Sequence, residues 1–363
     1  MALLGEAGER MTPDLRQAYH GSVRKKWLVL TLLLVLLLVV LLFSFDAGTV
    51  SVGLEELIRG LTGQEPLDEM KGYILREVRF PRIAMALLTG VALAAAGVIM
   101  QAILRNPLAS PFTLGVSSGA SFGAALAIVL GTSLFGLEQA VHSARWLIAL
   151  NSFLFGSIAV MLVYGIAKLK KGSTTVLLLA GVAMGHLFSS GVSALKYFSN
   201  NEALKDLVVW LMGGFWGADW EVIRWLAPGL LLSLVVLMCF AWDLNVLGMG
   251  EEVAGTAGVH VRRTRFVTLL TVTIIASAAT AFTGVIGFIG LVAPHIARML
   301  IGVDHRFLIP AASLCGAIML LAADTFARTI LSPVEIPVGI VTSVIGVPFF
   351  IYLLIKKRRD HWN

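Results

Sequence analysis

Three arginines lie at the edges of long apolar segments, where a positive charge is unusual and calls for a specific partner or environment. Arg79 and Arg82 flank a Phe-Pro dipeptide, and Arg328 follows Asp324 by four residues. Residues four apart on a helix are neighbours, so Asp324 can pair with Arg328 and orient it. Arginines of this kind either snorkel toward a membrane surface or present positive charge to an acidic partner. The residues alone leave both interpretations open.

A second group combines prolines and evenly spaced glycines in the stretch NPLASPFTLGVSSGASFGA, residues 106–124. Its two prolines lack backbone N–H groups and restrict the residues before them, so one helix must stop here and the next must start late. Three glycines then recur every four residues, namely Gly115, Gly119 and Gly123. This spacing predicts a helix face that packs closely against another helix in a membrane. A helical hairpin with no further role would show the same pattern.

A third group is the segment GEEVAGTAGV, residues 250–259, which predicts a short helix. Glu251 and Glu252 suit the positive N-terminal end of a helix, and Gly258 is placed to end it. The alternative is a solvated helix within a loop that contacts nothing. The arginines that follow it, between residues 262 and 265, are expected to anchor the next apolar segment.

No residue pattern typical of an enzyme appears in the sequence. It contains no GxxxxGK[ST] loop for phosphates, no HExxH, and no Ser/His/Asp or paired-carboxylate set in its apolar segments. Cys239 and Cys315 lack metal-ligand spacing, and His186 and His295 have no acidic or cysteine neighbours at such spacing. We therefore expect no catalytic residue, no metal site and no cofactor bound by this chain. If the protein moves a solute uphill, the energy must come from a partner.

These three groups of residues lie at the ends of long apolar segments or between them. Hydrophobic residues make up 58% of the 363 residues and charged residues only 14%, against about 45–50% and 25% in soluble chains. The segments lack the two-residue alternation of barrel strands. The sequence therefore predicts an all-α integral membrane protein that contacts the lipid bilayer. Its net charge of +6 reflects where Lys and Arg lie relative to the membrane and predicts no nucleic-acid partner.

About ten membrane-spanning helices are predicted from the apolar runs and from the Gly, Pro and charged residues between them. They are expected near 27–45, 83–104, 115–131, 146–167, 175–196, 222–242, 266–282, 284–300, 307–326 and 336–355. The span near 284–300 is the weakest, because it is short and contains a proline and a histidine. Short surface helices are expected within 46–80 and 201–221.

The distribution of charge orients these spans. If the N-terminus is cytoplasmic and the segments alternate, most of the 28 Lys and Arg residues fall on the cytoplasmic side. The positive-inside rule then places both termini in the cytoplasm of a multi-pass cell (inner or plasma) membrane protein. We expect a cytoplasmic segment at 1–26, a single transmembrane domain at 27–355 and a basic cytoplasmic tail at 356–363.

Several stretches closely resemble the FecCD-type permease subunits of ATP-binding-cassette (ABC) importers for iron-siderophore, haem and vitamin B12. They run from Arg76 to Ala124 and continue with LLLAGVAMGH, WLMGGFWGADW, GEEVAGTAGV, the segment 287–328 and EIPVGIVTSVIGVPFFIYLL. They occur in the family's order and cover nearly the whole chain beyond residue 70. The resemblance implies a type II ABC importer permease fold with ten spans per subunit, working as a dimer. Residues 1–26 have no recognised counterpart.

The resemblance also implies roles for the three groups of residues. Arg79, Arg82 and Arg328 would face a docked extracytoplasmic substrate-binding protein that presents acidic side chains. The cytoplasmic gate of the pathway would be formed by Asn106 and Leu108, and the residues facing it would be Ser173, Thr174 and Thr175. The segment 250–259 would insert into a cleft of the ATPase and couple to it through Gly250, Glu251, Glu252, Ala254, Gly255, Ala257 and Gly258.

These implications predict a transport subunit without catalysis of its own, which moves its cargo by alternating access. ATP and Mg would be bound by separate cytoplasmic ABC ATPase subunits, and a second permease subunit, identical or merely similar, would complete the pathway. The expected cargo is a ferric siderophore, with haem or cobalamin as alternatives. An ion-coupled secondary transporter would instead show inverted repeats and intramembrane acids, and a membrane enzyme would show a catalytic set; the sequence shows neither.

Overall fold

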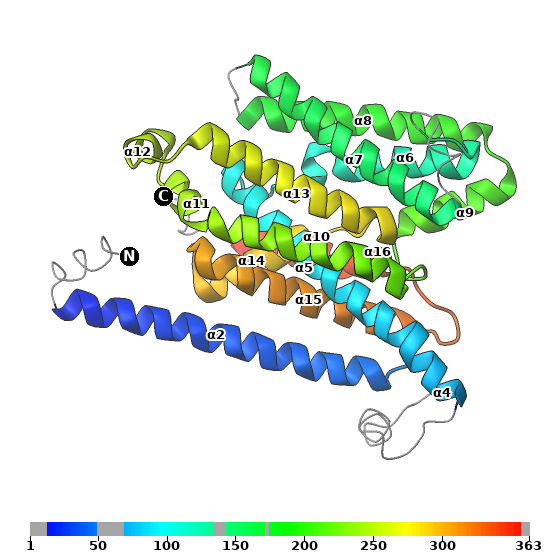
Figure 1. Cartoon of the computed structure of the whole chain (residues 1–363), viewed down its shortest axis with the longest axis horizontal. Coiled ribbons are helices and arrows are strands. Elements are labelled where there is room, and N and C mark those ends of the chain that lie inside the picture. The colour runs from blue at the N-terminus through cyan, green and yellow to red at the C-terminus, as the bar shows by residue number, and fades with distance from the viewer. Residues whose placement is uncertain (1–12, 49–68, 134–142, 171–173, 357–363) are drawn as a thin grey trace.

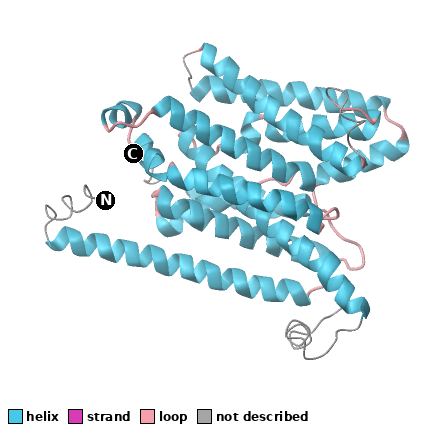
Figure 2. Ribbon diagram, in the orientation of Figure 1, coloured by secondary structure: helices cyan, strands magenta, loops and turns pink. Residues whose placement is uncertain are grey.

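A computed structural model of the full chain gives the fold. It describes residues 13–48, 69–133, 143–170 and 174–356. Within these residues every regular element is a helix and no strand is present (Figure 2). Seven helices of this described part are long and apolar enough to cross a membrane. A helix satisfies its backbone polar groups internally, as lipid requires, and the prediction of an all-α membrane protein is confirmed.

Each predicted span corresponds to a helix of the described chain. Those that exceed the length needed to cross a membrane are α2 (Pro13–Asp46), α5 (Phe80–Leu104), α7 (Ala144–Leu169), α8 (Thr174–Phe198), α10 (Trp220–Cys239), α13 (Val261–Thr283) and α15 (His305–Thr329). Shorter apolar stretches form α6 (Val116–Leu130), α14 (Ile289–Ile301) and α16 (Val338–Lys356). Ten helices of the described chain thus correspond to the ten predicted spans, and seven of them are long and apolar enough to cross a membrane.

The N-terminal helix α2 is longer than the span predicted at 27–45. It begins at Pro13, inside the predicted N-terminal segment, and contains 34 residues. At 1.5 Å per residue it extends about 51 Å, which exceeds the roughly 30 Å hydrocarbon core of a bilayer. It lies along the outside of the bundle against α15 (Figure 1). Its first turns therefore extend beyond the membrane-spanning part of the bundle.

Helix α5 lies at the centre of the bundle, in contact with α10, α13, α14 and α15 (Figure 1). A short helix, α4 (Glu69–Tyr73), and a π-helical turn, η1 (Ile74–Arg79), lead into it without a break. Glycines give α5 its closest contacts, because a Cβ on Gly90 would lie 2.4 Å from the carbonyl oxygen of Gly316. Membrane helices associate through such close backbone packing, since lipid is as apolar as the helices themselves.

The three glycines at the start of α6 have two different roles. A Cβ on Gly119 would lie 2.5 Å from the carbonyl oxygen of Phe155, and one on Gly123 would lie 2.2 Å from that of Asn151. Both glycines thus let α6 pack against α7. Gly115 departs from the predicted packing role: it precedes α6 with a φ of 89°, and its nearest neighbours would be 3.8 Å from a Cβ. Its left-handed backbone is what requires glycine.

Two of the short helices begin inside the bundle. Helix α6 follows a non-helical turn and the 3-10 turn η2 (Pro111–Leu114), and α14 follows the non-helical residues 284–288. The predicted span at 284–300 is corrected accordingly, because α14 has only 13 residues, which extend about 20 Å. Irregular backbone at this depth is tolerated where protein buries it, and Leu114 and Ile286 are both buried.

Three further helices mark the two ends of the bundle. At one end, here called the α12 end, lie α11 (Ala241–Gly248) and α12 (Glu251–Thr256); at the other, the α9 end, lies α9 (Asn201–Met212), within the surface segment predicted at 201–221 (Figure 1). The other predicted surface helix, within 46–80, falls largely outside the described residues.

Candidate functional site

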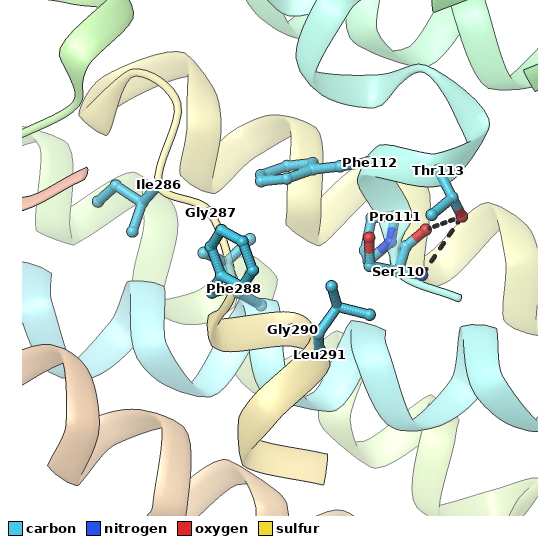
Figure 3. Close-up of a pocket in the computed structure, with 10 residues that line it drawn as sticks. Ser110, Pro111, Phe112, Thr113, Ile286, Gly287, Phe288, Gly290 and Leu291 are labelled. Atoms are coloured by element: carbon cyan, nitrogen blue, oxygen red, sulfur yellow. Dashed lines mark hydrogen bonds between the residues drawn. The ribbon is translucent and has the colours of Figure 1, made fainter. Parts of the chain in front are cut away.

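Two helix breaks meet at a cavity of about 320 Å³. One wall is the segment 110–113 before α6, and the other is the segment 286–291 around the start of α14 (Figure 3). The aromatic rings of Phe112 and Phe288 lie on these two walls (Figure 3). Phe288 holds a left-handed backbone with a φ of 66°, which a bulky residue adopts only under constraint. The two interruptions, whose phenylalanines are 176 residues apart in the sequence, thus form one site.

The first wall satisfies its own polar groups. The Thr113 hydroxyl donates to the Ser110 carbonyl at 2.7 Å and accepts from the Ser110 N–H at 3.3 Å. Such local bonds replace the helical ones that the prolines remove. Nearer the α12 end, the Asn106 side chain accepts from the Leu108 N–H at 2.9 Å. The turn therefore has a fixed shape that does not depend on water.

The turn after α5 is tied to α11. Arg105 has a left-handed backbone, with a φ of 45°, and its Nη2 donates to the Leu247 carbonyl at 2.9 Å. Leu247 lies in α11, which carries α12. The turn with the predicted gate residues Asn106 and Leu108 is therefore mechanically linked to the α12 end, and Leu108 is exposed there. Sequence reasoning missed this link, because Arg105 bonds to a backbone carbonyl 142 residues away.

The other predicted gate segment starts α8. Thr174 is half-buried and Thr175 is exposed, whereas Ser173 lies outside the described residues. Gly181 brings α8 against the proline-containing turn, because a Cβ there would lie 2.3 Å from the Thr113 carbonyl oxygen. The structure thus joins the two predicted gate segments through a glycine that the sequence analysis did not single out.

One exposed face of helix α8 carries polar residues, here called the polar stripe, together with the exposed apolar residues Leu179 and Val182. Thr175, His186, Ser190 and Ser193 are all exposed in the described chain. Separations of 11 and 18 residues from Thr175 place His186 and Ser193 on the same face of the helix. Polar groups in spans usually face a water-filled cavity or another protein surface, since hydrocarbon does not satisfy them. The sequence contained this signal in the spacing of these residues.

Helix α12 projects from the bundle on α11 (Figure 1). Glu252 and Val253 are exposed, and Glu251 accepts a hydrogen bond from Arg265 Nη2 at 2.8 Å. Gly250 precedes the helix, and Gly258 follows it with a φ of 83°, as the sequence predicted.

Ala254 has a different position from the predicted one. It is fully buried and packs with the α11 residues Val246 and Leu247. It therefore holds α12 on the bundle and has no surface to offer a partner. Gly255 and Ala257 are exposed, and a Cβ on Gly255 would meet nothing within 4 Å.

Two of the three predicted docking arginines, Arg79 and Arg328, are buried. Arg79 is 5% exposed, and its Nη1 donates to the Phe45 carbonyl at 2.8 Å. Arg328 is 8% exposed and donates to the carbonyls of Ser44 and Ala47. The last carbonyls of a helix have no partner within it, so both arginines cap the end of α2. The prediction that they are displayed to a docked protein is corrected in this respect.

Asp324 binds two of these arginines. It is fully buried, accepts from Arg82 Nε at 3.0 Å and Nη2 at 2.9 Å, and lies 3.6 Å from Arg328 Nε. The predicted pair with Arg328 is present, but Arg82 is the closer partner. Arg82 also donates to Glu335 at 2.8 Å, and Glu335 is exposed. The surface of this cluster is thus the Arg82–Glu335 pair, and sequence reasoning missed Glu335.

Asp304 connects three elements at the α12 end. Its carboxylate accepts from Arg306 Nη2 at 2.8 Å, Asn245 Nδ2 at 2.9 Å and Lys26 Nζ at 3.4 Å. Burial raises the pKa of Asp304, but the hydrogen bonds from Arg306 and Asn245 outweigh this effect and hold the pKa well below its ordinary value. Asp304 therefore stays charged at neutral pH and ties α2 and α11 to α15.

No group of three or more His, Cys, Asp or Glu side chains that could hold a metal ion occurs among the described residues. The geometry instead offers fixed turns, a linked surface helix and the polar stripe of α8.

The sequence pattern of the FecCD transport family matches residues 36–356. A proposed ABC transporter permease of Methanocaldococcus jannaschii is 40% identical over 352 residues, covering 95% of this chain and 99% of the relative. An Fe(3+)-citrate import permease of Bacillus subtilis is 37% identical over 336 residues, covering 93% and 97%. Other relatives are named as permeases for haem, molybdate and vitamin B12.

A solved structure gives the same picture in three dimensions. It is described as an inward-facing conformation of a proposed metal-chelate type ABC transporter. It aligns with a TM-score of 0.79 at 34% identity and covers 90% of this chain and 99% of that one. Both the sequence and the arrangement of helices are therefore similar over nearly the full length.

Proposed function

Because the chain belongs to the FecCD transport family, we propose that it is the permease subunit of an ATP-driven importer whose cargo is a ferric siderophore. The observation that carries this proposal is the family match over residues 36–356, which includes the last third of α2 and every later helix. The family's members are permease subunits of ABC importers for iron-citrate, haem, vitamin B12 and molybdate. Within it, the iron-citrate relative supports the choice of an iron chelate; haem and cobalamin are the alternatives.

In this proposal the α12 end faces the cytoplasm, where both termini lie and where separate ATPase subunits bind ATP and Mg. The coupling surface is formed by exposed residues of α12 and of the turn after it, namely Glu251, Glu252, Val253, Gly255, Ala257 and Gly258, with the half-buried Gly250 before the helix. Buried Ala254 transmits their displacement to α11, and the bond from Arg105 to Leu247 transmits it to the turn of Asn106 and Leu108. This route supports a gate that opens when the ATPases move α12, as alternating access requires.

The pathway in this proposal forms between two permease subunits, identical or similar. The polar stripe of α8 supports this, because the exposed side chains of Thr175 and His186 need water or another protein surface to face. The residues Ser173, Thr174 and Thr175 would then lie beside the gate turn at the cytoplasmic end. The cargo would pass a weakly binding surface, and selectivity would rest mainly with the external binding protein.

That binding protein would dock at the α9 end. Arg82 and Glu335 supply a charged surface pair there, and such pairs set register and association rate more than affinity. Arg79 and Arg328 would contribute by holding the end of α2 in place. All three arginines would thus belong to the docking site, but only Arg82 would contact the binding protein directly.

The test is to purify the tagged full-length chain from its own membranes in mild detergent and to identify the retained proteins and small molecules by mass spectrometry. We expect an ATPase with a phosphate-binding loop, an external binding protein and a ferric siderophore. Repeated recovery of the intact chain without an ATPase would refute the importer. Recovery of haem or cobalamin with an ATPase would keep the importer and refute the siderophore.

A further inference from the structure

A second cavity, of about 410 Å³, lies between α7, α10 and α13, with Ala92 of α5 also in its lining. The described residues that line it are apolar or aromatic, and they include Trp146, Phe153, Trp225, Gly229, Ile274 and Phe282. Trp225 is 71% exposed and Ile274 is 40% exposed. The described part of the chain therefore leaves this cavity open along one side, as a groove.

The groove runs along the spans. On α7 its lining extends from Trp146 to Phe153, and on α13 it extends from Phe282 back to Ile274. These separations correspond to roughly 11–12 Å at 1.5 Å per residue. One leaflet of a bilayer contributes about 15 Å of the hydrocarbon core. The groove thus has nearly the length and the direction of a lipid chain in the leaflet at the α9 end.

We propose that this groove binds an acyl chain of a membrane phospholipid. Water would be a poor occupant, because a buried water needs two to four polar partners and the described lining offers only the indole N–H groups. An empty groove would forfeit the dispersion contacts of its walls. The medium beside an apolar, open groove within a membrane span is lipid. The proposal rests on the chain being a membrane protein and does not depend on the cargo.

Charges at the mouth of the groove select the headgroup. The Arg145 guanidinium lies 6.0 Å from the centre of the Trp146 ring and pairs with Asp219 and Glu221, the latter at 3.2 Å. Burial raises the pKa of Asp219, but the Val222 N–H and Arg145 outweigh this and lower it below its ordinary value. One positive charge therefore faces two negative ones.

This arrangement disfavours a purely anionic headgroup and suits a zwitterionic one. The phosphate of a phosphoethanolamine headgroup can approach Arg145, and its ammonium group can approach Glu221, which is exposed. We therefore expect phosphatidylethanolamine to be retained in preference to phosphatidylglycerol.

The test uses the full-length chain in nanodiscs made of equal parts phosphatidylethanolamine and phosphatidylglycerol, followed by native mass spectrometry. The wild type should retain one phosphatidylethanolamine per chain. Gly229→Leu should reduce this occupancy about tenfold or more, equivalent to about 1.4 kcal/mol. A Cβ on Gly229 meets nothing within 4 Å, so the leucine fills the groove without a backbone clash.

Gly165→Leu is the matched control. Gly165 lies in α7, its Cβ would also meet nothing within 4 Å, and it does not line the groove. Its lipid retention should equal that of the wild type. If Gly229→Leu fails to give a single peak on size exclusion, Ala278→Leu fills the same groove from α13.

Three outcomes would overturn the proposal. The first is undiminished lipid in a folded groove-filling variant. The second is preferential retention of phosphatidylglycerol. The third is a wild type that retains no lipid but forms a dimer that Gly229→Leu disrupts, which would show that a second copy covers the groove. Lipids brominated on the acyl chain give an independent measurement: they should quench wild-type tryptophan fluorescence more than that of Trp225→Phe.

Discussion

Replacement of Asp324 by asparagine tests whether one buried carboxylate holds the α9 end together. The substitution keeps the volume of the side chain and removes the negative charge that faces Arg82 and Arg328. Asp324 is fully buried and accepts hydrogen bonds from two nitrogens of Arg82, Nε and Nη2. An asparagine would offer one oxygen and would turn an N–H₂ group toward a guanidinium. Arg82 would keep only Glu335, which is exposed to solvent.

The burial of this ion pair determines how much stability the substitution should remove. Removing one partner of a buried ion pair costs about 3–5 kcal/mol, because the other charge stays buried without compensation. The matched control is Glu221→Gln, at the same end of the bundle. Glu221 pairs with Arg145 at 3.2 Å, but its side chain is 59% exposed. Exposed pairs contribute only about 0–1 kcal/mol.

The assay heats each purified variant in detergent and measures the fraction that still elutes as a folded peak on size exclusion. A change of 1 kcal/mol shifts the midpoint by about 2–4 °C in a chain of 150–250 residues, and by less in a longer one. We expect Asp324→Asn to lower the midpoint by on the order of 5 °C and Glu221→Gln by under about 2 °C.

A double variant sharpens the comparison. Asp324→Asn combined with Arg82→Gln removes both charges, so it should recover part of the loss, as coupled neighbours do in a double-mutant cycle. Equal shifts for Asp324→Asn and Glu221→Gln would refute the argument that burial makes this pair costly to break.

Three further predictions follow from the same geometry. Gly123→Ala should lower the folded yield on size exclusion more than Gly185→Ala, because the added Cβ would lie 2.2 Å from a carbonyl oxygen in the first case and 3.7 Å from a hydroxyl in the second. Asp304 contributes stability above about pH 4 that is lost as the pH falls through its lowered pKa; thermal midpoints of wild type and Asp304→Asn should therefore converge in acid. Val253→Asp should weaken co-purification of the ATPase without changing the thermal midpoint. Ala254→Leu, at a buried position, should lower the thermal midpoint. An unchanged ATPase yield with Val253→Asp would contradict the proposed coupling surface.

Local properties of the chain predicted the class of fold well. Apolar run length, breaks at Gly and Pro and the positions of charges are all read along the sequence, and they located a helix for each predicted span. These properties predicted the structure least well at residues 284–288, which are not helical although they are as apolar as a membrane-spanning helix. A Cβ on Gly284 would lie 2.1 Å from the Trp210 carbonyl oxygen, so contact with the end of α9 holds this segment in place. Such a contact has no local signature.

For the candidate site too, some features could be predicted from the sequence and others depended on the tertiary structure. The sequence by itself determined that Arg79, Arg82 and Arg328 lie at one end of the bundle and that a short helix forms within residues 250–259, because span order and helix capping are local. Only the tertiary structure decided that Arg82, 242 residues from Asp324, is the closer partner of that carboxylate, and that Arg79 and Arg328 cap α2. A buried charge and an uncapped helix end both need partners in a medium without water. Which partner satisfies them depends on the helices that packing brings together.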